Sequence, residues 1–178
     1  MPVTILSTAS SLTFAQRLAA CLGSPVTEPD RQLFPDGEQY LRLPLAGYFD
    51  FVGRDVILVG ATENSTSLEE ICRLASAAIK HGARTLVLVV PYFGYSTMER
   101  AVKPGEAVTA KVIARQLSSL PRAPRGNWVL LMDLHSAGIV HYFEGDTVAM
   151  ELYAESRIVP AIERLNLTDL TLASTDMG

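Results

Sequence analysis

The chain has 178 residues, of which 48% are hydrophobic and 19% are charged, so it can bury a sizeable core. This composition excludes an intrinsically disordered protein or a low-complexity scaffold, and the length suits one domain or one and a half small ones. The 15 basic residues are outnumbered by 19 acidic ones, and the net charge of −4 gives no indication of binding to nucleic acid or to an anionic membrane.

The first predicted elements are a strand and a helix. The β-branched strand covers Val3–Ser7, and the helix that follows is capped by Ser10 or Ser11 and ends at Gly23. The apolar face of that helix is expected to hold Phe14, Leu18, Cys21 and Leu22. Residues 26–42 contain two prolines and a glycine, which is typical of short strands around a turn.

Three runs are apolar along nearly their whole length, as expected for strands buried on both faces of a parallel sheet. These runs are residues 55–60, 85–90 and 127–134. A helix is expected after the first run, capped by Thr66 or Ser67 and closed by Gly82, and another over residues 108–120. Residues 91–106 should form an exposed, mobile loop, because glycine and proline interrupt them.

The end of the chain predicts a helix over residues 150–165 and a strand over residues 170–174. Strands that alternate with helices indicate an α/β fold with a largely parallel sheet. Because a lone final strand needs neighbours, we expect residues 1–148 to form a first domain and residues 149–178 to begin a second one.

Two cysteines, Cys21 and Cys72, form no CxxC motif and are too few for a disulfide framework. Each falls on the apolar side of a predicted helix, so we expect two buried free thiols. The N-terminus lacks the basic region of a signal peptide, and no apolar run reaches the length that spans a bilayer. These features predict a cytoplasmic protein.

Ligands of parallel α/β folds bind beyond the carboxyl ends of the strands. The loops at those ends are residues 61–65, 91–106, 133–138 and 175–178. Asp133 and His135 lie two residues apart in the third loop, where they could bind a divalent ion and orient phosphates. An Asp133 that caps the next turn, with His135 hydrogen-bonded nearby, is the equally weighted alternative.

Two segments combine turn signals with aromatic residues. Residues 33–38 (LFPDGE) predict a β-turn with two carboxylates and an exposed Phe34. Residues 91–95 (PYFGY) follow a buried strand and could either pack over the sheet edge or stack on a base. The chain has neither a GxGxxG nor a P-loop motif, so neither a dinucleotide fold nor a P-loop is supported.

Four segments, in their order and spacing, resemble the ribose-phosphate pyrophosphokinase family. They are residues 34–38 (FPDGE), 91–95 (PYFGY), 109–111 (TAK) and 132–135 (MDLH), and the resemblance runs from about Phe34 to Gly178. It implies phosphoribosyltransferase-like α/β domains, each with a mostly parallel sheet flanked by helices. It also implies transfer of diphosphate from magnesium-bound ATP to the 1-hydroxyl of ribose 5-phosphate, which yields phosphoribosyl pyrophosphate.

The resemblance further implies the residues that bind adenine. Asp36, Gly37 and Glu38 match the positions that contact this base across a subunit interface, and Phe34 would stack nearby. An interface of this kind implies self-association as a homodimer or a larger assembly.

A Mg²⁺ site is implied by the same resemblance. His135, with Asp133 behind it, would lie at the magnesium ion and the ATP phosphates, and Asp176 matches a further magnesium position.

The loop after Tyr95 departs from the family pattern. The family usually has Arg-Gln-Asp-Arg there, whereas this chain has Thr97, Met98, Glu99 and Arg100. Thr97, Met98 and Arg100 still match positions that contact ATP. Because a neutral Thr cannot make the charge-assisted bonds of Arg to phosphate, we expect weakened ATP binding.

Neither the flexible catalytic loop nor the acidic loop for ribose phosphate is found in the sequence, so no catalytic residue is assigned. The chain is therefore expected to be catalytically incomplete. Two alternatives are a regulatory or scaffold homologue that does not catalyse, and a nucleobase phosphoribosyltransferase, which would need an acidic loop that the sequence lacks.

Overall fold

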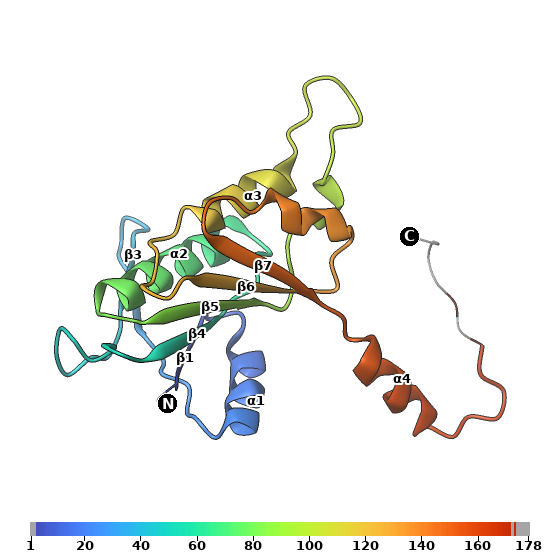
Figure 1. Cartoon of the computed structure of the whole chain (residues 1–178), viewed down its shortest axis with the longest axis horizontal. Coiled ribbons are helices and arrows are strands. Elements are labelled where there is room, and N and C mark those ends of the chain that lie inside the picture. Colours follow the sequence, from blue (N-terminus) through green and yellow to red (C-terminus); the bar gives the residue numbers. More distant parts are fainter. Residues whose placement is uncertain (1–2, 172, 174–178) are drawn as a thin grey trace.

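The computed structural model describes residues 3–171 and 173, and its main feature is a sheet of five parallel strands (Figure 1). In order across the sheet, the strands are β1 (Val3–Ser7), β4 (Asp55–Val59), β5 (Thr85–Val90), β6 (Asn127–Met132) and β7 (Thr147–Leu152). The α-helices of these residues are α1 (Leu12–Leu22), α2 (Ser65–Lys80), α3 (Thr109–Ser118) and α4 (Glu155–Glu163). There are also two 3-10 turns, η1 (Ser96–Met98) and η2 (Ala137–Tyr142), among the described residues. An antiparallel hairpin is formed by β2 (Asp30–Leu33) and β3 (Gln39–Arg42).

Helices lie on both faces of the sheet, with α2 and α3 on one face and α1 on the other (Figure 1). Neighbouring strands of the sheet all pair in parallel, and the helices α2 and α3 serve as crossover connections between them. The predicted α/β class with a mostly parallel sheet flanked by helices is therefore confirmed.

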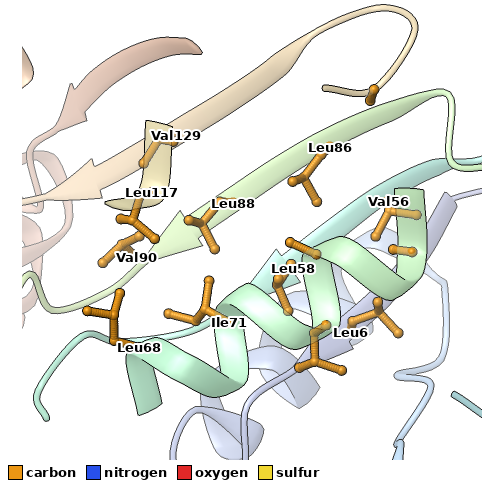
Figure 2. Close-up of a cluster of buried hydrophobic side chains, with 14 of the residues drawn as sticks. Leu6, Val56, Leu58, Leu68, Ile71, Leu86, Leu88, Val90, Leu117 and Val129 are labelled. Carbon is orange, nitrogen blue, oxygen red and sulfur yellow. The ribbon is translucent and has the colours of Figure 1, made fainter. Parts of the chain in front are cut away.

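The larger core lies between the sheet and the helices α2 and α3. Figure 2 shows Leu58 and Leu88 of the sheet close to Ile71 of α2, and Leu117 of α3 close to Val90. All five side chains are fully buried. On the opposite face, Val59 of β4 and Val89 of β5 are buried in the smaller core. The apolar runs of β4 and β5 thus have the double-sided burial that their sequences predicted.

Ser11 is the N-cap residue of α1, as predicted, although its side chain does not bond to the helix, and the predicted cap of α2 is wrong. The side chain of Asn64 caps α2 by accepting a hydrogen bond of 2.9 Å from the amide of Ser67, so Thr66 and Ser67 lie within the first turn. Ser11 precedes α1, but its hydroxyl accepts a hydrogen bond of 3.0 Å from the amide of Ala61 instead of capping the helix. That bond ties the start of α1 to the loop after β4.

The predicted apolar face of α1 is correct only for Leu18, which is half-buried and packs against the smaller core. The helix buries Ala15 and Ala19 against the sheet, while Phe14, Cys21 and Leu22 are exposed. Because the two alanines allow the helix to approach the strands closely, the larger side chains lie at the sides of the contact. Sequence periodicity alone weighted the large residues too heavily.

Both cysteines are free thiols, as predicted, but they are not both buried. Cys21 is exposed on α1, which corrects the prediction, and Cys72 is half-buried on α2. Burial raises the pKa of the Cys72 thiol above its ordinary value, which favours the protonated form.

The helix predicted over residues 150–165 begins too early. Residues 147–152 form β7, which pairs along its whole length with β6, and the helix covers only Glu155–Glu163. Every second residue of β7 is exposed, namely Val148, Met150 and Leu152. This alternation is typical of a strand that is covered on one face only. The boundary expected after residue 148 falls inside this strand, so the first sheet extends to Leu152.

After α4, the described residues include only part of the strand predicted over residues 170–174. Leu170, Thr171 and Ala173 are not in a strand, and the rest of the strand predicted over residues 170–174 lies outside the described residues. Asp176 also lies outside them. Within the described part of the chain, no helix is both long enough and apolar enough to cross a membrane.

The loop after β5 passes close to the loop after β4 at Gly94. The amide of Gly94 donates a 2.9 Å hydrogen bond to the hydroxyl of Thr62, and the amide of Thr62 donates a 3.0 Å bond to the carbonyl of Tyr92. A Cβ atom at Gly94 would lie 2.1 Å from the carbonyl oxygen of Thr62. This contact requires glycine and fixes the path on which the loop leaves the sheet.

We predict that Gly94→Ala lowers the free energy of unfolding by about 1–3 kcal/mol, because the added methyl group forces two backbone segments apart. Urea denaturation of the purified chain measures the loss. Gly138→Ala is the control, since its Cβ atom would lie 3.6 Å from the nearest atom, the hydroxyl of Ser136. Equal unfolding midpoints for the two variants would contradict the prediction.

Candidate functional site

Residues 34–38 form the predicted turn at the tip of the β2–β3 hairpin. The amide of Phe34 donates to the carbonyl of Glu38 over 2.8 Å, and the amide of Gly37 donates to the carbonyl of Phe34 over 2.9 Å. Asp36 accepts a 3.0 Å bond from the amide of Glu38. Gly37 has a φ of 90°, a left-handed conformation that favours glycine. The turn is therefore ordered by its own backbone while its two carboxylates remain exposed.

A cavity of about 670 Å³ lies between this turn and α2. It is lined by residues 36–39 and by Thr66, Glu69 and Arg73. Arg73 lies within 2.6 Å of a Glu69 carboxylate oxygen, which balances its charge. The cavity is polar and open, and it is large enough to admit part of a small ligand beside the turn.

An aromatic pair supports the base of the turn. The rings of Phe34 and Tyr40 meet edge to face, with their centroids 6.1 Å apart. Phe34 is 37% exposed, so part of its ring remains available for stacking on a ligand. The predicted exposed Phe34 is confirmed.

Residues 91–95 divide into a buried part and an exposed part. Phe93 is buried and packs against Phe143, with 6.4 Å between ring centroids. Tyr92 and Tyr95 are exposed. The central aromatic residue therefore packs over the sheet edge, and its neighbours are the ones open to a ligand.

The loop that follows carries Thr97, Met98 and Arg100, all exposed. These three side chains line a cavity of about 420 Å³ together with Val102, Glu106 and Ala107. Arg100 lies 3.6 Å from the carboxylate of Glu99 in an exposed and therefore weak ion pair. Thr97 and Met98 add no charge to this cavity.

Glu106 closes the far end of the same loop. Its carboxylate accepts hydrogen bonds from the amides of Lys103, at 2.9 Å, and Val102, at 2.7 Å. These two bonds hold the pKa of Glu106 below its ordinary value, because they stabilise the charged form. The loop thus has internal order although its side chains face solvent.

Asp133 ends β6 in a left-handed conformation, with a φ of 43°. Its carboxylate accepts a 3.0 Å hydrogen bond from the amide of Ala154, and its own amide donates to the carbonyl of Leu152 over 3.0 Å. Asp133 therefore binds the backbone of the loop after β7 rather than capping the turn that directly follows it. His135 is exposed two residues later.

Glu151, near the end of β7, and Tyr153, directly after it, lie close to Asp133 and His135 in the fold, and the sequence did not predict them as part of this region. Glu151 accepts a 2.9 Å bond from the amide of Leu134, between Asp133 and His135, and another of 2.9 Å from the hydroxyl of Tyr153. The bond to Glu151 raises the pKa of Tyr153, and burial and the negative charges of Glu151 and Asp133 raise it further. Only the pairing of β7 with β6 reveals this contact.

The described site residues lie in three places in the structure. The turn of residues 34–38 belongs to a hairpin that is bonded to the end of β1, whereas Asp133 and His135 follow β6. Two strands separate β1 from β6, which puts the strands about 14 Å apart. The 34–38 turn and the loop of residues 97–100 line separate cavities.

Asp133 and His135 do not form a closed metal site. Among residues 3–171 and 173, no group of three or more acidic, histidine or cysteine side chains is arranged to hold a metal ion. Mg²⁺ usually binds through one or two carboxylates, several waters and the substrate phosphates. A single carboxylate beside an imidazole therefore fits a magnesium ion that arrives with a nucleotide better than a resident ion.

Comparisons with known proteins show the family to which the chain belongs. A family model described as the N-terminal domain of ribose phosphate pyrophosphokinase matches residues 3–120. A ribose-phosphate pyrophosphokinase of Chlorobaculum tepidum is 29% identical over 180 residues, covering 99% of this chain and 52% of the relative. One from Halobacterium salinarum is 31% identical over 174 residues, covering 98% and 58%. The chain thus spans about half the length of the curated relatives that it matches.

The fold is shared with a solved structure. Phosphoribosylpyrophosphate synthetase from Mycobacterium smegmatis aligns with a TM-score of 0.76 at 19% identity, covering 92% of this chain and 52% of that one. The alignment confirms the predicted phosphoribosyltransferase-like α/β fold.

We predict that Glu151→Gln lowers the pKa of the Tyr153 phenol, because the variant removes the negative charge that disfavours the tyrosinate. The measurement is a pH titration of tyrosinate absorbance, with the Tyr153→Phe variant subtracted as background. Glu155→Gln, a nearby loss of the same charge, should leave the pKa closer to that of the native chain. Equal titrations for the two glutamine variants would show that the bond between Glu151 and Tyr153 does not form.

Proposed function

Because the chain belongs to the family of the N-terminal domain of ribose phosphate pyrophosphokinase, we propose that it forms the nucleotide-binding part of a ribose-phosphate diphosphokinase. Such an enzyme transfers diphosphate from magnesium-bound ATP to the 1-hydroxyl of ribose 5-phosphate. The observation that carries this proposal is the family match over residues 3–120, which includes the 34–38 turn and the loop after β5. The comparisons favour this family over the nucleobase phosphoribosyltransferases.

The 34–38 turn has the chemistry of an adenine site. The carboxylates of Asp36 and Glu38 can accept hydrogen bonds from the exocyclic amine of the base, and the exposed part of Phe34 offers a stacking surface. Gly37 lets the backbone approach closely, since no Cβ projects from it. The adjoining cavity leaves room for the nucleotide.

Asp133 and His135 are the proposed contacts to magnesium and the phosphates. Magnesium, when bound with ATP, neutralises phosphate charge and so eases attack by the sugar hydroxyl. One carboxylate oxygen of Asp133 is fixed by the amide of Ala154, and this bond orients the side chain. Glu151 holds the backbone between Asp133 and His135 in place. Asp176 remains a proposed magnesium position.

A second copy of the chain would complete the site. Within one chain, the 34–38 turn is bonded to the β1 side of the sheet, while Asp133 and His135 are at β6. A neighbouring copy could bring its turn to the loops at the β6 side. This geometry supports the proposal of a homodimer or larger assembly with the turn near the interface.

The uncharged residues at positions 97 and 98 favour one alternative function. Thr97 and Met98 line the cavity beside Arg100 without offering a charge to a phosphate. A homologue that keeps the fold and has lost tight ATP binding could act as a regulatory or scaffold subunit. Nucleotide binding distinguishes this alternative from the enzyme.

We predict that the chain binds magnesium-ATP weakly and that Thr97→Arg combined with Met98→Gln strengthens binding. A hydrogen bond to a charged group contributes about 1.5–3 kcal/mol, so the gain should be roughly one to two orders of magnitude in Kd. His135→Ala should weaken whatever binding the native chain has. Isothermal titration calorimetry measures all three forms.

Arg122→Gln is the matched control for this titration, because it changes an exposed arginine that is ion-paired with Asp146. It should leave the affinity for magnesium-ATP unchanged. Tight binding by the native chain, weakened by the double change, would show that positions 97 and 98 do not face the phosphates.

We also predict that the chain self-associates through a surface that includes residues 34–38. Sedimentation velocity over a range of concentrations should show a dimer or larger species. Phe34→Ser should shift the equilibrium toward monomer, and Tyr48→Ser, which changes another exposed aromatic residue, should not. A strict monomer at high protein concentration would contradict the prediction.

A further inference from the structure

The β2–β3 hairpin has little packing of its own. Every residue of β2 is exposed, and in β3 only Leu41 is half-buried. A two-stranded hairpin is at best marginally stable in water unless it packs against other elements. Because the hairpin carries the 34–38 turn at its tip, whatever holds the hairpin also sets the position of the turn.

Close packing against α2 does not hold it. A cavity of about 270 Å³ separates the hairpin from the helix. Leu33, Tyr40 and Leu41 line it from the hairpin, and Thr66, Glu70 and Arg73 line it from α2. Apolar contact that is interrupted by such a space cannot fix the orientation of the hairpin with the precision of a packed core.

Two polar contacts bridge the gap. One is exposed: Arg73 of α2 donates from Nη1 to the carbonyl of Gln39 over 3.1 Å and to its Oε1 over 3.3 Å. The other is a part-buried cluster that also includes the end of β1.

Arg31 of β2 donates from Nε to Glu70 of α2 over 2.6 Å and from Nη2 to the carbonyl of Ser7 over 2.7 Å. The second carboxylate oxygen of Glu70 accepts a 3.1 Å bond from the amide of Ala9. The hairpin, the end of β1 and the middle of α2 are thus joined by one guanidinium and one carboxylate.

Burial makes this cluster different from the other ion pair of the hairpin. The side chain of Glu70 is 12% exposed and that of Arg31 is 31% exposed. Arg42 and Asp30 also pair at 2.6 Å, but they are 65% and 53% exposed and link β3 only to β2. An exposed pair contributes little, whereas removing one partner of a buried pair leaves an uncompensated charge.

We propose that Arg31 and Glu70 are positioning residues that fix the orientation of the hairpin and, through it, of the 34–38 turn. The planar guanidinium bonds two acceptors on different elements at once, so it sets an angle as well as a distance. Its significance for nucleotide binding rests on the function proposed above for the turn. The anchoring itself does not rest on that function.

Hydrogen–deuterium exchange of the 178-residue chain tests the anchoring directly. In Arg31→Met, amides of residues 30–42 should exchange at least about tenfold faster, because the released hairpin opens locally. Amides of Thr85–Val90 and Asn127–Met132 should keep their native protection. Glu70→Gln should also speed the exchange of amides of residues 30–42. Arg42→Met is the matched control, and it should leave the hairpin nearly as protected as in the native chain.

Two results overturn the anchoring. Native protection of residues 30–42 in both Arg31→Met and Glu70→Gln shows that the cluster does not hold the hairpin. Faster exchange throughout the sheet shows that the pair stabilises the whole fold rather than positioning one element. Arg31→Lys, which keeps the charge but cannot bond two acceptors in one plane, should give an intermediate rate for the hairpin only.

Calorimetry with magnesium-ATP separates anchoring from function. If the turn binds nucleotide, Arg31→Met should raise the Kd at least about tenfold while Arg42→Met leaves it unchanged. If Arg31→Met speeds exchange in the hairpin but binds magnesium-ATP as tightly as the native chain, the link between anchoring and nucleotide binding is overturned. A native chain with no measurable binding would refute the function proposed for the turn, and the exchange data would still decide the anchoring.

Discussion

Parallel pairing of β4 with β5 is the constraint on which the rest of the structure depends. Parallel neighbours cannot be joined by a tight turn, so the chain must cross the sheet between them, and α2 is that crossing. The helix buries its apolar side on the strands, and α3 does the same between β5 and β6. Because all five strands run the same way, the loops after them leave one edge of the sheet, where the loops of residues 61–65, 91–106 and 133–138 meet.

The central elements could be predicted from the sequence because burial on both faces leaves an uninterrupted apolar run. β4, β5 and β6 carry such runs, and each was predicted within a few residues. β7 is covered on one face only, and the sequence wrongly predicts a helix that begins at Met150, inside this strand. For α1 the error has another cause, since the small Ala15 and Ala19 face the sheet with Leu18 beside them, while Phe14 and Leu22 are exposed.

The candidate site was predictable only where its chemistry is local. The 34–38 turn follows from Pro, Asp and Gly in succession, and the structure confirms it. The bond from Glu151 to the backbone beside His135 depends on the pairing of β7 with β6, and the bond between Arg31 and Glu70 joins residues 39 positions apart. Neither leaves a signal in sequence spacing, because both arise from how separate elements pack.

The division between sheet and loops also bears on function. The sheet and its helices account for the alignment with a solved synthetase at 19% identity, since buried positions tolerate exchange among apolar residues. Thr97, Met98 and Arg100 are exposed and take no part in the core. Substitutions there cost the fold little, yet under the proposed function they would decide which charges meet a phosphate. Under that proposal nucleotide affinity can diverge between relatives that share the same sheet, and the exposed loops are where that divergence is to be measured.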